Sequence, residues 1–363
     1  MKYLDEFRDP ARARKVAQAI EYVTPAGREF AFMEVCGTHT MAIARYGLKR
    51  LLPPNVGLVS GPGCPVCVTP KEYVDHAVAL ARTPGVTVAT FGDMMRVPGS
   101  SADLFRLQAE GANVRVVYSA RDALDLARAE PARKVVFLAV GFETTSPTVA
   151  ATVKAAAAEG VGNFFVLTAH KLIPPAMRAL CEKEDLALDG FLCPAHVSAI
   201  IGSSAYDFVA DGYELACAVA GFEPVDILQG IYLLLTQYAD GERRVDNQYS
   251  RVVKTAGNRR AQELLAEVFE VCDSRWRGLG ELPASGSALR EEYAAFDAAR
   301  AIDVEPEETV PDCGCICGDV LTGVKVPADC ALFGGRCTPG APVGPCMVSS
   351  EGSCAAAFKY GYE

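Results

Sequence analysis

The sequence has no apolar run long enough to cross a membrane. Apolar stretches such as residues 135–140 and 164–169 are far shorter than the roughly 20 residues that a membrane-spanning helix needs. The first sixteen residues, MKYLDEFRDPARARKV, also lack the apolar core of a secretory signal. We therefore expect a soluble, cytoplasmic protein with no membrane partner.

Lysine and arginine are also fewer than aspartate and glutamate. The 363 residues contain 35 Lys and Arg against 45 Asp and Glu, a net charge of −10, and no local basic patch. Such a chain repels phosphate backbones and anionic lipids, so no nucleic acid is expected as a partner. The phosphate-binding patterns GxxxxGKS and GxGxxG are also absent, which leaves nucleotide binding of the familiar kinds unsupported.

The chain does contain a regular alternation of β-branched runs and helical segments over its first 240 residues. This alternation is typical of βα units in mostly parallel sheets, and it predicts an α/β fold with one large sheet or two lobes. The runs expected to be strands are residues 30–35, 56–60, 86–90, 114–119, 135–140, 164–169 and 190–193. Further helices are expected over residues 258–271 and 289–300, joined by a Gly/Pro/Ser-rich passage at 278–287.

Polar side chains follow six of these strands at the point where each one ends. In open α/β sheets, ligands bind outside the carboxyl ends of the strands, where loops meet the free amides of helix N-termini. The residues concerned are Cys36 with His39, Cys64 with Cys67, Asp93, Glu143, His170 with Lys171, and His196. The repetition predicts a cleft along this edge, although each histidine could also be a packing residue and each carboxylate a helix cap.

Cysteine is abundant, with fourteen residues, and in a cytosolic chain this indicates metal or redox chemistry. Cys64-Pro-Val-Cys67 precedes a helix expected to start at Thr69-Pro70, and a helix N-terminus lowers the pKa of a thiol. This CxxC could chelate a metal or form a disulfide. Half of a zinc knuckle is the alternative, but the second CxxC is missing. Cys36 could add a third sulfur, a set that suits iron.

The tail from about residue 309 is expected to be rich in loops, and it holds seven cysteines between Cys313 and Cys354. Four thiolates on Gly/Pro loops are what a [4Fe–4S] cluster requires, and sulfurs would be left over. A zinc ribbon is the alternative, although its typical CxxC pairs are absent. Cys315 and Cys317 are too close to chelate one tetrahedral ion well, so one could bind metal while the other is a redox thiol.

Six motifs together resemble one family. They are CGTHT (36–40), GPGCPVCVTP (61–70), FGDMMRVPGS (91–100), GFETTSP (141–147), PAHVSAIIG (194–202), and the tail CICGDVLTG through CTPGAPVGPCMVSSEGSC. They are similar to those of the HypD hydrogenase maturation factors over nearly the whole chain. Two departures are Met41, where a second histidine is often found, and Ala195, where glycine is common.

The resemblance implies a redox-active assembly scaffold rather than a classical turnover enzyme. Such a scaffold would hold iron while the Fe(CN)2(CO) unit of [NiFe]-hydrogenase is built, with a HypC-type small protein as partner and a HypE-type protein as cyanide donor. Cys36, Cys64 and Cys67 would hold the iron. His39, Glu143 and His196 would line the cleft. The alternative is a free-standing iron–sulfur thiol–disulfide oxidoreductase, which has no need of Cys36.

The resemblance also implies two parallel-sheet α/β lobes and a small, loop-dominated C-terminal iron–sulfur domain. We expect lobes at residues 1–130 and 131–250, a helical connector at 251–308 and the [4Fe–4S] domain at 309–363. The family's ligand spacing selects Cys315, Cys330, Cys337 and Cys354 for the cluster. Cys317 and Cys346 would then form a second redox dithiol, and Cys313 fits no family position.

Overall fold

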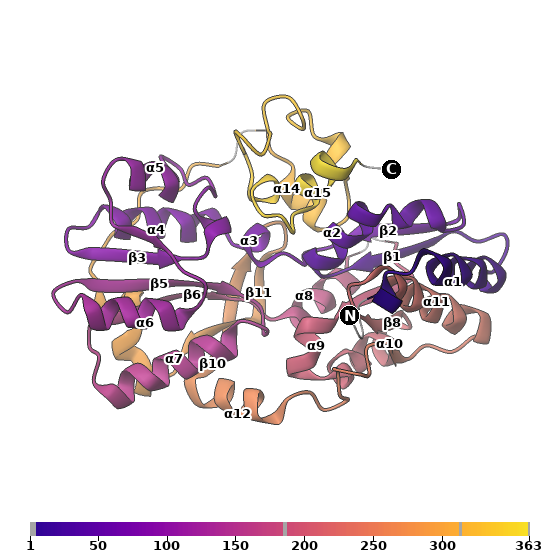
Figure 1. The fold of residues 1–363 in the computed structure, drawn as a ribbon, viewed down its shortest axis with the longest axis horizontal. Helices are drawn as coiled ribbons and strands as arrows, with labels where there is room; N and C mark the ends of the chain where they lie inside the picture. Colours follow the sequence, from indigo (N-terminus) through magenta and orange to yellow (C-terminus); the bar gives the residue numbers. More distant parts are fainter. Residues whose placement is uncertain (1–4, 184–186, 312–313, 362–363) are drawn as a thin grey trace.

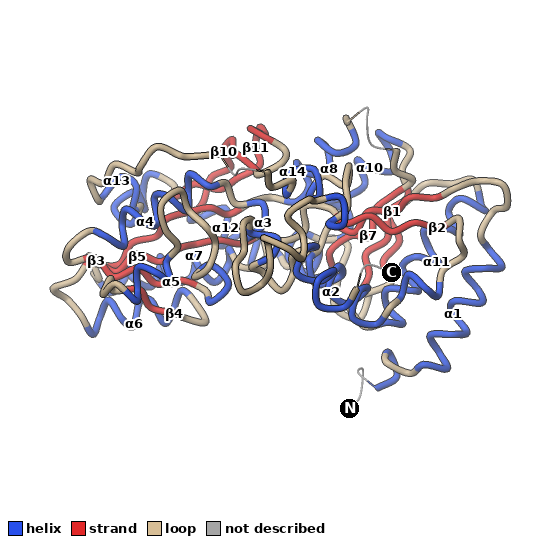
Figure 2. The backbone as a smooth tube through the Cα atoms, turned by 90° about the horizontal axis from the view of Figure 1, so that it is seen from above, coloured by secondary structure: helices blue, strands red, loops and turns tan. Residues whose placement is uncertain are grey.

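The computed structural model describes residues 5–183, 187–311 and 314–361. Two parallel sheets lie in two lobes at opposite ends of an elongated molecule, and the cysteine-rich tail lies over the junction between them (Figures 1 and 2). This arrangement confirms the predicted α/β fold with two lobes. No helix in the described ranges is both long and apolar enough to span a bilayer.

The first lobe is built on a five-stranded parallel sheet of order β2-β1-β7-β8-β9. Helices α1, α2 and α11 cover one face with an apolar core, and α8, α9 and α10 cover the other. The strands are β1 (Phe30–Glu34), β2 (Val56–Ser60), β7 (Gly190–Pro194), β8 (Ala216–Ala220) and β9 (Val245–Asn247). The helices are α1 (Pro10–Val23), α2 (Gly37–Tyr46), α8 (Ile173–Cys181), α9 (Ala195–Ile201), α10 (Asp207–Tyr213) and α11 (Pro224–Asp240).

The second lobe is built on a four-stranded parallel sheet of order β4-β3-β5-β6. Helices α6 and α7 pack on one face, and α4 and α5 pack on the other. The strands are β3 (Val86–Thr90), β4 (Val114–Val116), β5 (Lys134–Gly141) and β6 (Phe164–His170). The helices are α4 (Lys71–Arg82), α5 (Leu104–Ala109), α6 (Ala120–Ala129) and α7 (Ser146–Glu159), with α12 (Arg259–Val268) against α7.

The expected lobe boundary at residue 130 does not match the sheets, because it falls between β4 and β5 of the same sheet. The chain starts in the first lobe, builds the whole second sheet, and returns to place β7 directly beside β1. Helical period and strand composition reveal the elements but carry no information on which strands pair, so the sequence did not show this return. The strands β8 and β9 were also missed, since β8 reads ACAVA and alanine favours helix.

The predicted helical connector is wrong over its central part. Helix α12 ends at Val268, and β10 (Phe269–Trp276) and β11 (Gly280–Leu289) form an antiparallel hairpin over the passage that was expected to be irregular. The two ends of β10, Phe269 and Trp276, are buried, and the residues between them are exposed or half-buried. This is the pattern of a two-stranded ribbon that is anchored at its ends. Phe269 and Leu289 anchor the hairpin in the core of the second lobe, and Trp276 carries its tip to the centre of the molecule.

Short helices complete the chain. Those of the tail are few and short, so the tail is rich in loops, as predicted. The short helices are η1 (Asp5–Phe7), η2 (Leu48–Leu51), α3 (Pro65–Val68), η3 (Gly92–Met94), η4 (Ser203–Tyr206), η5 (Glu291–Phe296), α13 (Ala298–Ala301), α14 (Cys317–Leu321), η6 (Pro327–Asp329), η7 (Pro345–Met347) and α15 (Ser353–Tyr360). Helix α15 packs on α2 of the first lobe, and α14 and η7 contact α3. The tail therefore lies directly on the edge where sequence reasoning expects a cleft.

Candidate functional site

Two loops meet closely at the carboxyl edge of the first sheet. Gly63 follows β2 and lies against the backbone of Cys36, which follows β1, so that a Cβ on Gly63 would overlap the N and Cα atoms of Cys36. The amide of Gly37 also donates a hydrogen bond to the Gly63 carbonyl, with an N···O distance of 2.8 Å. Only glycine permits this approach of two backbones. It brings Cys36 beside the start of the Cys64-Pro-Val-Cys67 segment.

The CxxC segment forms its own turn of helix, α3, and its two sulfurs are joined in a disulfide with a Cα–Cα distance of 5.2 Å. The Cys64 sulfur accepts a hydrogen bond from the Cys67 amide at 3.2 Å and so caps the turn. Both residues are buried. The helix expected to start at Thr69-Pro70 is α4, which starts after Pro70 and has no side-chain cap. The Thr69 hydroxyl instead donates a hydrogen bond to the carbonyl of Pro65, the first residue of α3.

Cys36 is a buried free thiol at the start of α2. Burial, reinforced by the negative charge of Glu351, raises the pKa of Cys36 to about 12. Within the described residues, no three His, Cys, Asp or Glu side chains are arranged as a metal site. Cys36, Cys64 and Cys67 together are called the lobe site below. In the structure this site contains one thiol, Cys36, and one disulfide, Cys64–Cys67. Both disulfide sulfurs would have to be reduced before the trio could supply three thiolates.

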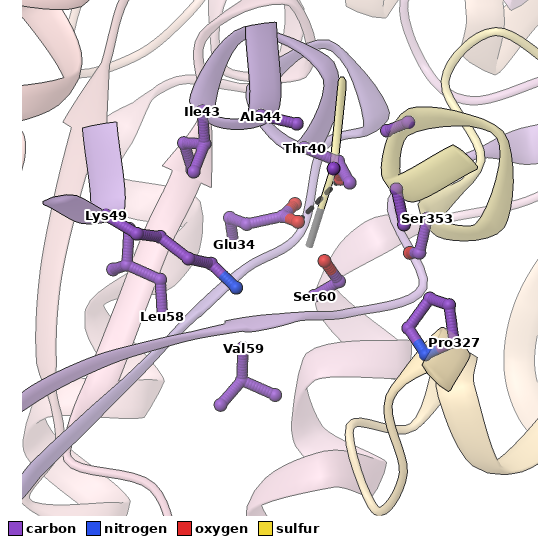
Figure 3. A pocket seen from close by; sticks show the side chains of 13 residues that line it. Glu34, Thr40, Ile43, Ala44, Lys49, Leu58, Val59, Ser60, Pro327 and Ser353 are labelled. Carbon is purple, nitrogen blue, oxygen red and sulfur yellow. Dashed lines mark hydrogen bonds between the residues drawn. The ribbon is translucent and has the colours of Figure 1, made fainter. Parts of the chain in front are cut away.

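Carboxylates surround Cys36, and two of them were not singled out from the sequence. Glu34 is buried in β1, where it accepts a hydrogen bond from the Thr40 hydroxyl at 2.5 Å and contacts the Cys36 amide at 3.4 Å. Burial raises the pKa of Glu34 to about 8. The same carboxylate lines a small pocket beneath the tail, together with Lys49 and Ser60 (Figure 3). The sequence did contain a signal for Glu34, because a glutamate inside the apolar run FAFMEV is expected to be buried.

Glu351 reaches the lobe site from the tail. Its carboxylate accepts a hydrogen bond from the Thr38 hydroxyl at 2.7 Å, next to Cys36. Burial raises the pKa of Glu351, and the nearby charge of Asp93 does so as well. Asp93, which follows β3 in the second lobe, is also 3.5 Å from the Ser349 hydroxyl. Both lobes and the tail therefore contribute acidic groups to one place.

The two predicted cleft histidines both have their rings against the ring of Phe222. The ring of His39 is 4.7 Å from that of Phe222, and the ring of His196 is 4.2 Å from it. His39 is buried, with Nε2 within 3.1 Å of the carbonyls of Ala220 and Gly221. Burial lowers the pKa of His39 to about 4, so it is a neutral donor that ties α2 to the end of β8. His196 is exposed.

Glu143 caps a helix in the centre of the molecule. One carboxylate oxygen accepts a hydrogen bond from the amide of Ile173, the first residue of α8, at 2.9 Å, and the other has no hydrogen-bond partner among the described residues. Burial raises the pKa of Glu143 to about 7. The alternative expected from the sequence was a cap on the next helix along the chain, which is α7; Glu143 instead caps α8, which starts thirty residues further on. Its neighbour Phe142 stacks on Trp276, with ring centroids 6.0 Å apart.

A second group of cysteines lines one small pocket in the tail. This tail site contains Cys315, Cys317, Cys330, Cys337, Cys346 and Cys354, with apolar neighbours that include Val320, Leu332, Phe333 and Met347. All four expected cluster ligands are among the six. Cys313 lies outside the described residues. Soft sulfur donors in an apolar shell fit the requirements of an iron–sulfur cluster.

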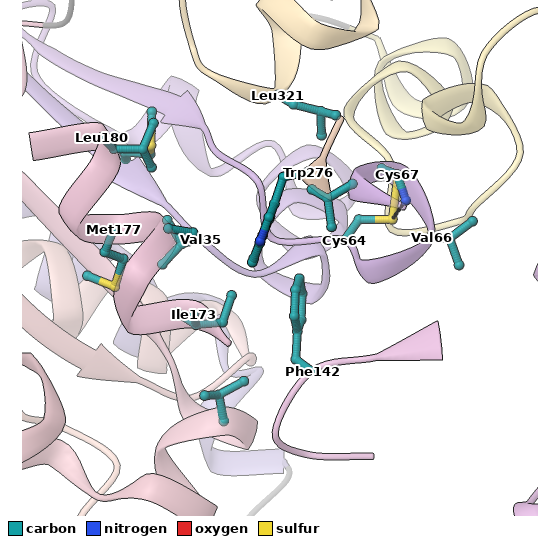
Figure 4. Packing of buried hydrophobic residues seen from close by; sticks show 14 of the residues in the cluster. Val35, Cys64, Val66, Cys67, Phe142, Ile173, Met177, Leu180, Trp276 and Leu321 are labelled. Atoms are coloured by element: carbon teal, nitrogen blue, oxygen red, sulfur yellow. Dashed lines mark hydrogen bonds between the residues drawn. A yellow bond between two sulfur atoms is a disulfide. The ribbon is translucent and has the colours of Figure 1, made fainter. Parts of the chain in front are cut away.

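The remaining two cysteines of the tail site form a close pair next to the lobe site. The sulfurs of Cys317 and Cys346 are 2.8 Å apart. The Cys67 sulfur lies 3.9 Å from the carbonyl of Pro345, the residue before Cys346. Both cysteine pairs belong to one buried apolar cluster, in which Trp276 and Leu321 pack beside the Cys64–Cys67 disulfide (Figure 4).

Comparisons with known proteins agree with this geometry. The family described as "HypD: Hydrogenase formation hypA family" matches residues 11–361. The chain belongs to the HypD family. It is 49% identical to "Hydrogenase maturation factor HypD" of Rhizobium leguminosarum bv. viciae over 369 residues, which cover 99% of this chain and 96% of that protein. It is 46% identical to the Escherichia coli (strain K12) protein of the same name over 369 residues, covering 99% and 98%.

In this member of the HypD family, motifs far apart in the sequence meet at one junction. Cys36, Cys64 and Cys67 lie at the edge of the first sheet, Asp93 and Glu143 approach from the second lobe, and the tail cysteines close the site from above (Figure 1). His39 and Glu143 serve as internal hydrogen-bonding residues in the structure, and His196 lies on the surface.

Proposed function

We propose that this protein is a redox-active scaffold in hydrogenase maturation, which holds iron while the Fe(CN)2(CO) unit is assembled. The observation that carries the proposal is the contact between the loops of Cys36 and Cys64. It brings a free thiol next to a CxxC pair that can open to two more thiols. Three soft thiolates with open positions suit a ferrous ion that must accept strong-field diatomic ligands.

The tail site fits a resident [4Fe–4S] cluster held by Cys315, Cys330, Cys337 and Cys354. These four residues line one apolar pocket, and the donor set is the one that such clusters use. When bound, the cluster would supply single electrons. The residues of the chain itself would provide the insulating apolar walls and would keep Cys317 and Cys346 next to the cluster.

The two cysteine pairs support a thiol relay within the proposed function. Iron can bind Cys64 and Cys67 only as thiolates, so their disulfide must first be reduced. The Cys317/Cys346 pair is the nearest dithiol, and its neighbour Pro345 is in contact with Cys67. Electrons that reach the tail site would thus open the lobe site for iron.

The proposed partners are a HypC-type small maturation protein and a HypE-type cyanide donor. Support comes from membership of the HypD family, whose named relatives are hydrogenase maturation factors. The cytoplasm is the proposed location, because thiols outside any disulfide, such as those of Cys36 and Cys193, are typical of a reducing compartment.

The decisive test is a count of iron and acid-labile sulfide in protein isolated anaerobically with its small partner. Wild type should contain one iron atom more than Cys36→Ala, with equal sulfide in both, because the lobe site alone would lose metal. Cys272→Ala is the matched control, since Cys272 is a half-buried cysteine of the β10–β11 hairpin outside both sites. Equal iron in wild type and Cys36→Ala would reject the scaffold.

Equal iron in wild type and Cys36→Ala would favour a free-standing iron–sulfur thiol–disulfide oxidoreductase. The observation in its favour is the Cys64–Cys67 disulfide beside a second dithiol. In this function Cys36 has no chemical task, so Cys36→Ala should retain full disulfide reductase activity on a protein substrate.

A further inference from the structure

The tip of the β10–β11 hairpin lies against the segments that carry the two cysteine pairs, although nothing in its sequence marks it as functional. Trp276 packs in the cluster that holds Cys64, Cys67, Cys317 and Cys346. Gly278 lies against the backbone of Gly318, the residue after Cys317, and a Cβ on Gly278 would come within 2.8 Å of the Gly318 carbonyl. Arg277 lies between Trp276 and Gly278 in the sequence.

Arg277 is tied to the end of the disulfide helix by two hydrogen bonds. Its backbone amide donates to the Val68 carbonyl at 2.8 Å, and its Nε donates to the Thr69 carbonyl at 3.3 Å. These carbonyls follow Cys67 directly. The side chain is half-buried, and its Nη2 atom is shielded from solvent. A guanidinium fixed in this way acts through a lower dielectric than a surface arginine does.

The charge of Arg277 also reaches the tail dithiol. Arg277 exerts an electrostatic attraction on the sulfur of Cys317 and on that of Cys346. The residue that holds the end of α3 therefore also brings a positive charge within electrostatic range of the tail dithiol.

We infer that Arg277 is a positioning residue for thiol–disulfide exchange between the Cys317/Cys346 dithiol and the Cys64–Cys67 disulfide. It holds the disulfide helix against the dithiol helix, and its charge stabilises the negative charge shared by the reacting sulfurs. The inference rests on the relay in the proposed function. It adds a residue outside every cysteine motif to that relay.

The exchange step balances within the chain. A thiolate of the Cys317/Cys346 pair attacks one sulfur of the Cys64–Cys67 disulfide, so that bond breaks and a mixed disulfide forms. The second tail thiol, after losing its proton, attacks the mixed disulfide. The products are a Cys317–Cys346 disulfide and two thiols at Cys64 and Cys67, which take up the two protons. Two electrons pass from the tail pair to the lobe pair. Each attack passes through a charge spread over sulfur, which a fixed guanidinium stabilises.

The test uses the full chain with Cys64–Cys67 oxidised, under anaerobic conditions. Dithiothreitol is added, samples are quenched with iodoacetamide, and mass spectrometry follows the opening of Cys64–Cys67. Arg277→Gln should slow the opening about tenfold, and Arg277→Lys should recover most of the rate because it keeps the charge. Arg275→Gln is the matched control, since Arg275 is an exposed hairpin arginine that pairs with Glu72 at 3.2 Å.

Two results separate failure of the inference from failure of the relay. If wild type and Cys317→Ala/Cys346→Ala open Cys64–Cys67 equally fast, the relay itself is absent. If that double variant is slow but Arg277→Gln opens at the wild-type rate, or Arg277→Lys is as slow as Arg277→Gln, the role of the Arg277 charge is overturned. Should Arg277→Gln fail to fold, the salt dependence of the wild-type rate decides: exchange should slow at high salt, and a salt-independent rate rejects the inference.

Discussion

The lobe site and the tail site use the same side chain but differ in the charges around it. The lobe site rests on the ends of β1 and β2, has the carboxylates of Glu34 and Glu351 close to Cys36, and contains a disulfide. The tail site is built from loops and short helices, and the described residues that line its pocket are cysteines and other residues without a carboxylate. The comparison teaches that the two proposed roles call for different neighbours: polar groups beside a site that would exchange ligands, and an apolar pocket around a cofactor that would stay bound.

The largest expected effect comes from removing a lobe sulfur. Cys64→Ser should reduce hydrogenase maturation to background, because neither the disulfide nor the three-thiolate set can form. The visible absorbance of the proposed tail cluster should stay unchanged, since all six cysteines of the tail site remain. The measurement is hydrogenase activity in cells that lack their own copy of the protein, with Cys272→Ser as control. Loss of the absorbance as well would show that the two sites are not separate.

The next effect is on the link between the sites. Cys317→Ala/Cys346→Ala should keep the cluster absorbance but lower maturation by at least about tenfold, because opening of the lobe disulfide then depends on slow reduction from solution. Cells and purified protein are assayed as above. Full maturation in this variant would mean that the lobe site obtains its electrons elsewhere.

A smaller effect should follow from crowding the lobe site without touching sulfur. Gly63→Ala places a methyl group on the backbone of Cys36 and should lower the free energy of unfolding by about 1–3 kcal/mol. Gly162→Ala is the control, because its Cβ would meet no atom within 4 Å. Urea unfolding measures both. An equal change in the two variants would remove the argument that the close loop approach constrains the lobe site.

The last effect is confined to high pH and concerns the buried carboxyl of Glu143, which caps α8. Its pKa is raised to about 7, so the folded state binds a proton more tightly than the unfolded state, and stability is lost as pH rises from about 4.5 through 7. Glu143→Gln removes this loss and should be more stable than wild type by about 1–3 kcal/mol at pH 8, with little difference near pH 4. Urea unfolding across this range checks it. A parallel pH dependence in both proteins would contradict the raised pKa.

Local sequence patterns predicted most of the strands in the first 240 residues. The strands β2 and β3 match the expected residues, and β1, β5, β6 and β7 do so within one residue at each end. Most of these strands are buried on both faces, which is why they appear in the sequence as short, nearly continuous apolar runs. The cleft residues followed from the strand ends. The hairpin β10–β11 did not, since its Gly, Ser and Pro residues have low strand propensity and only pairing with each other and burial of Trp276 stabilise it.

By itself the sequence determined the α/β class, the strand ends that carry reactive groups, and the two sets of cysteines, because these depend on residue type and on spacing along the chain. Tertiary structure decided the rest. It placed β7 beside β1, brought Glu351 to Thr38 near Cys36, set Pro345 and the adjoining Cys346 against Cys67, and carried Arg277 to the end of α3. These contacts join residues tens to hundreds of positions apart, and they depend on how apolar faces pack, which no local pattern contains.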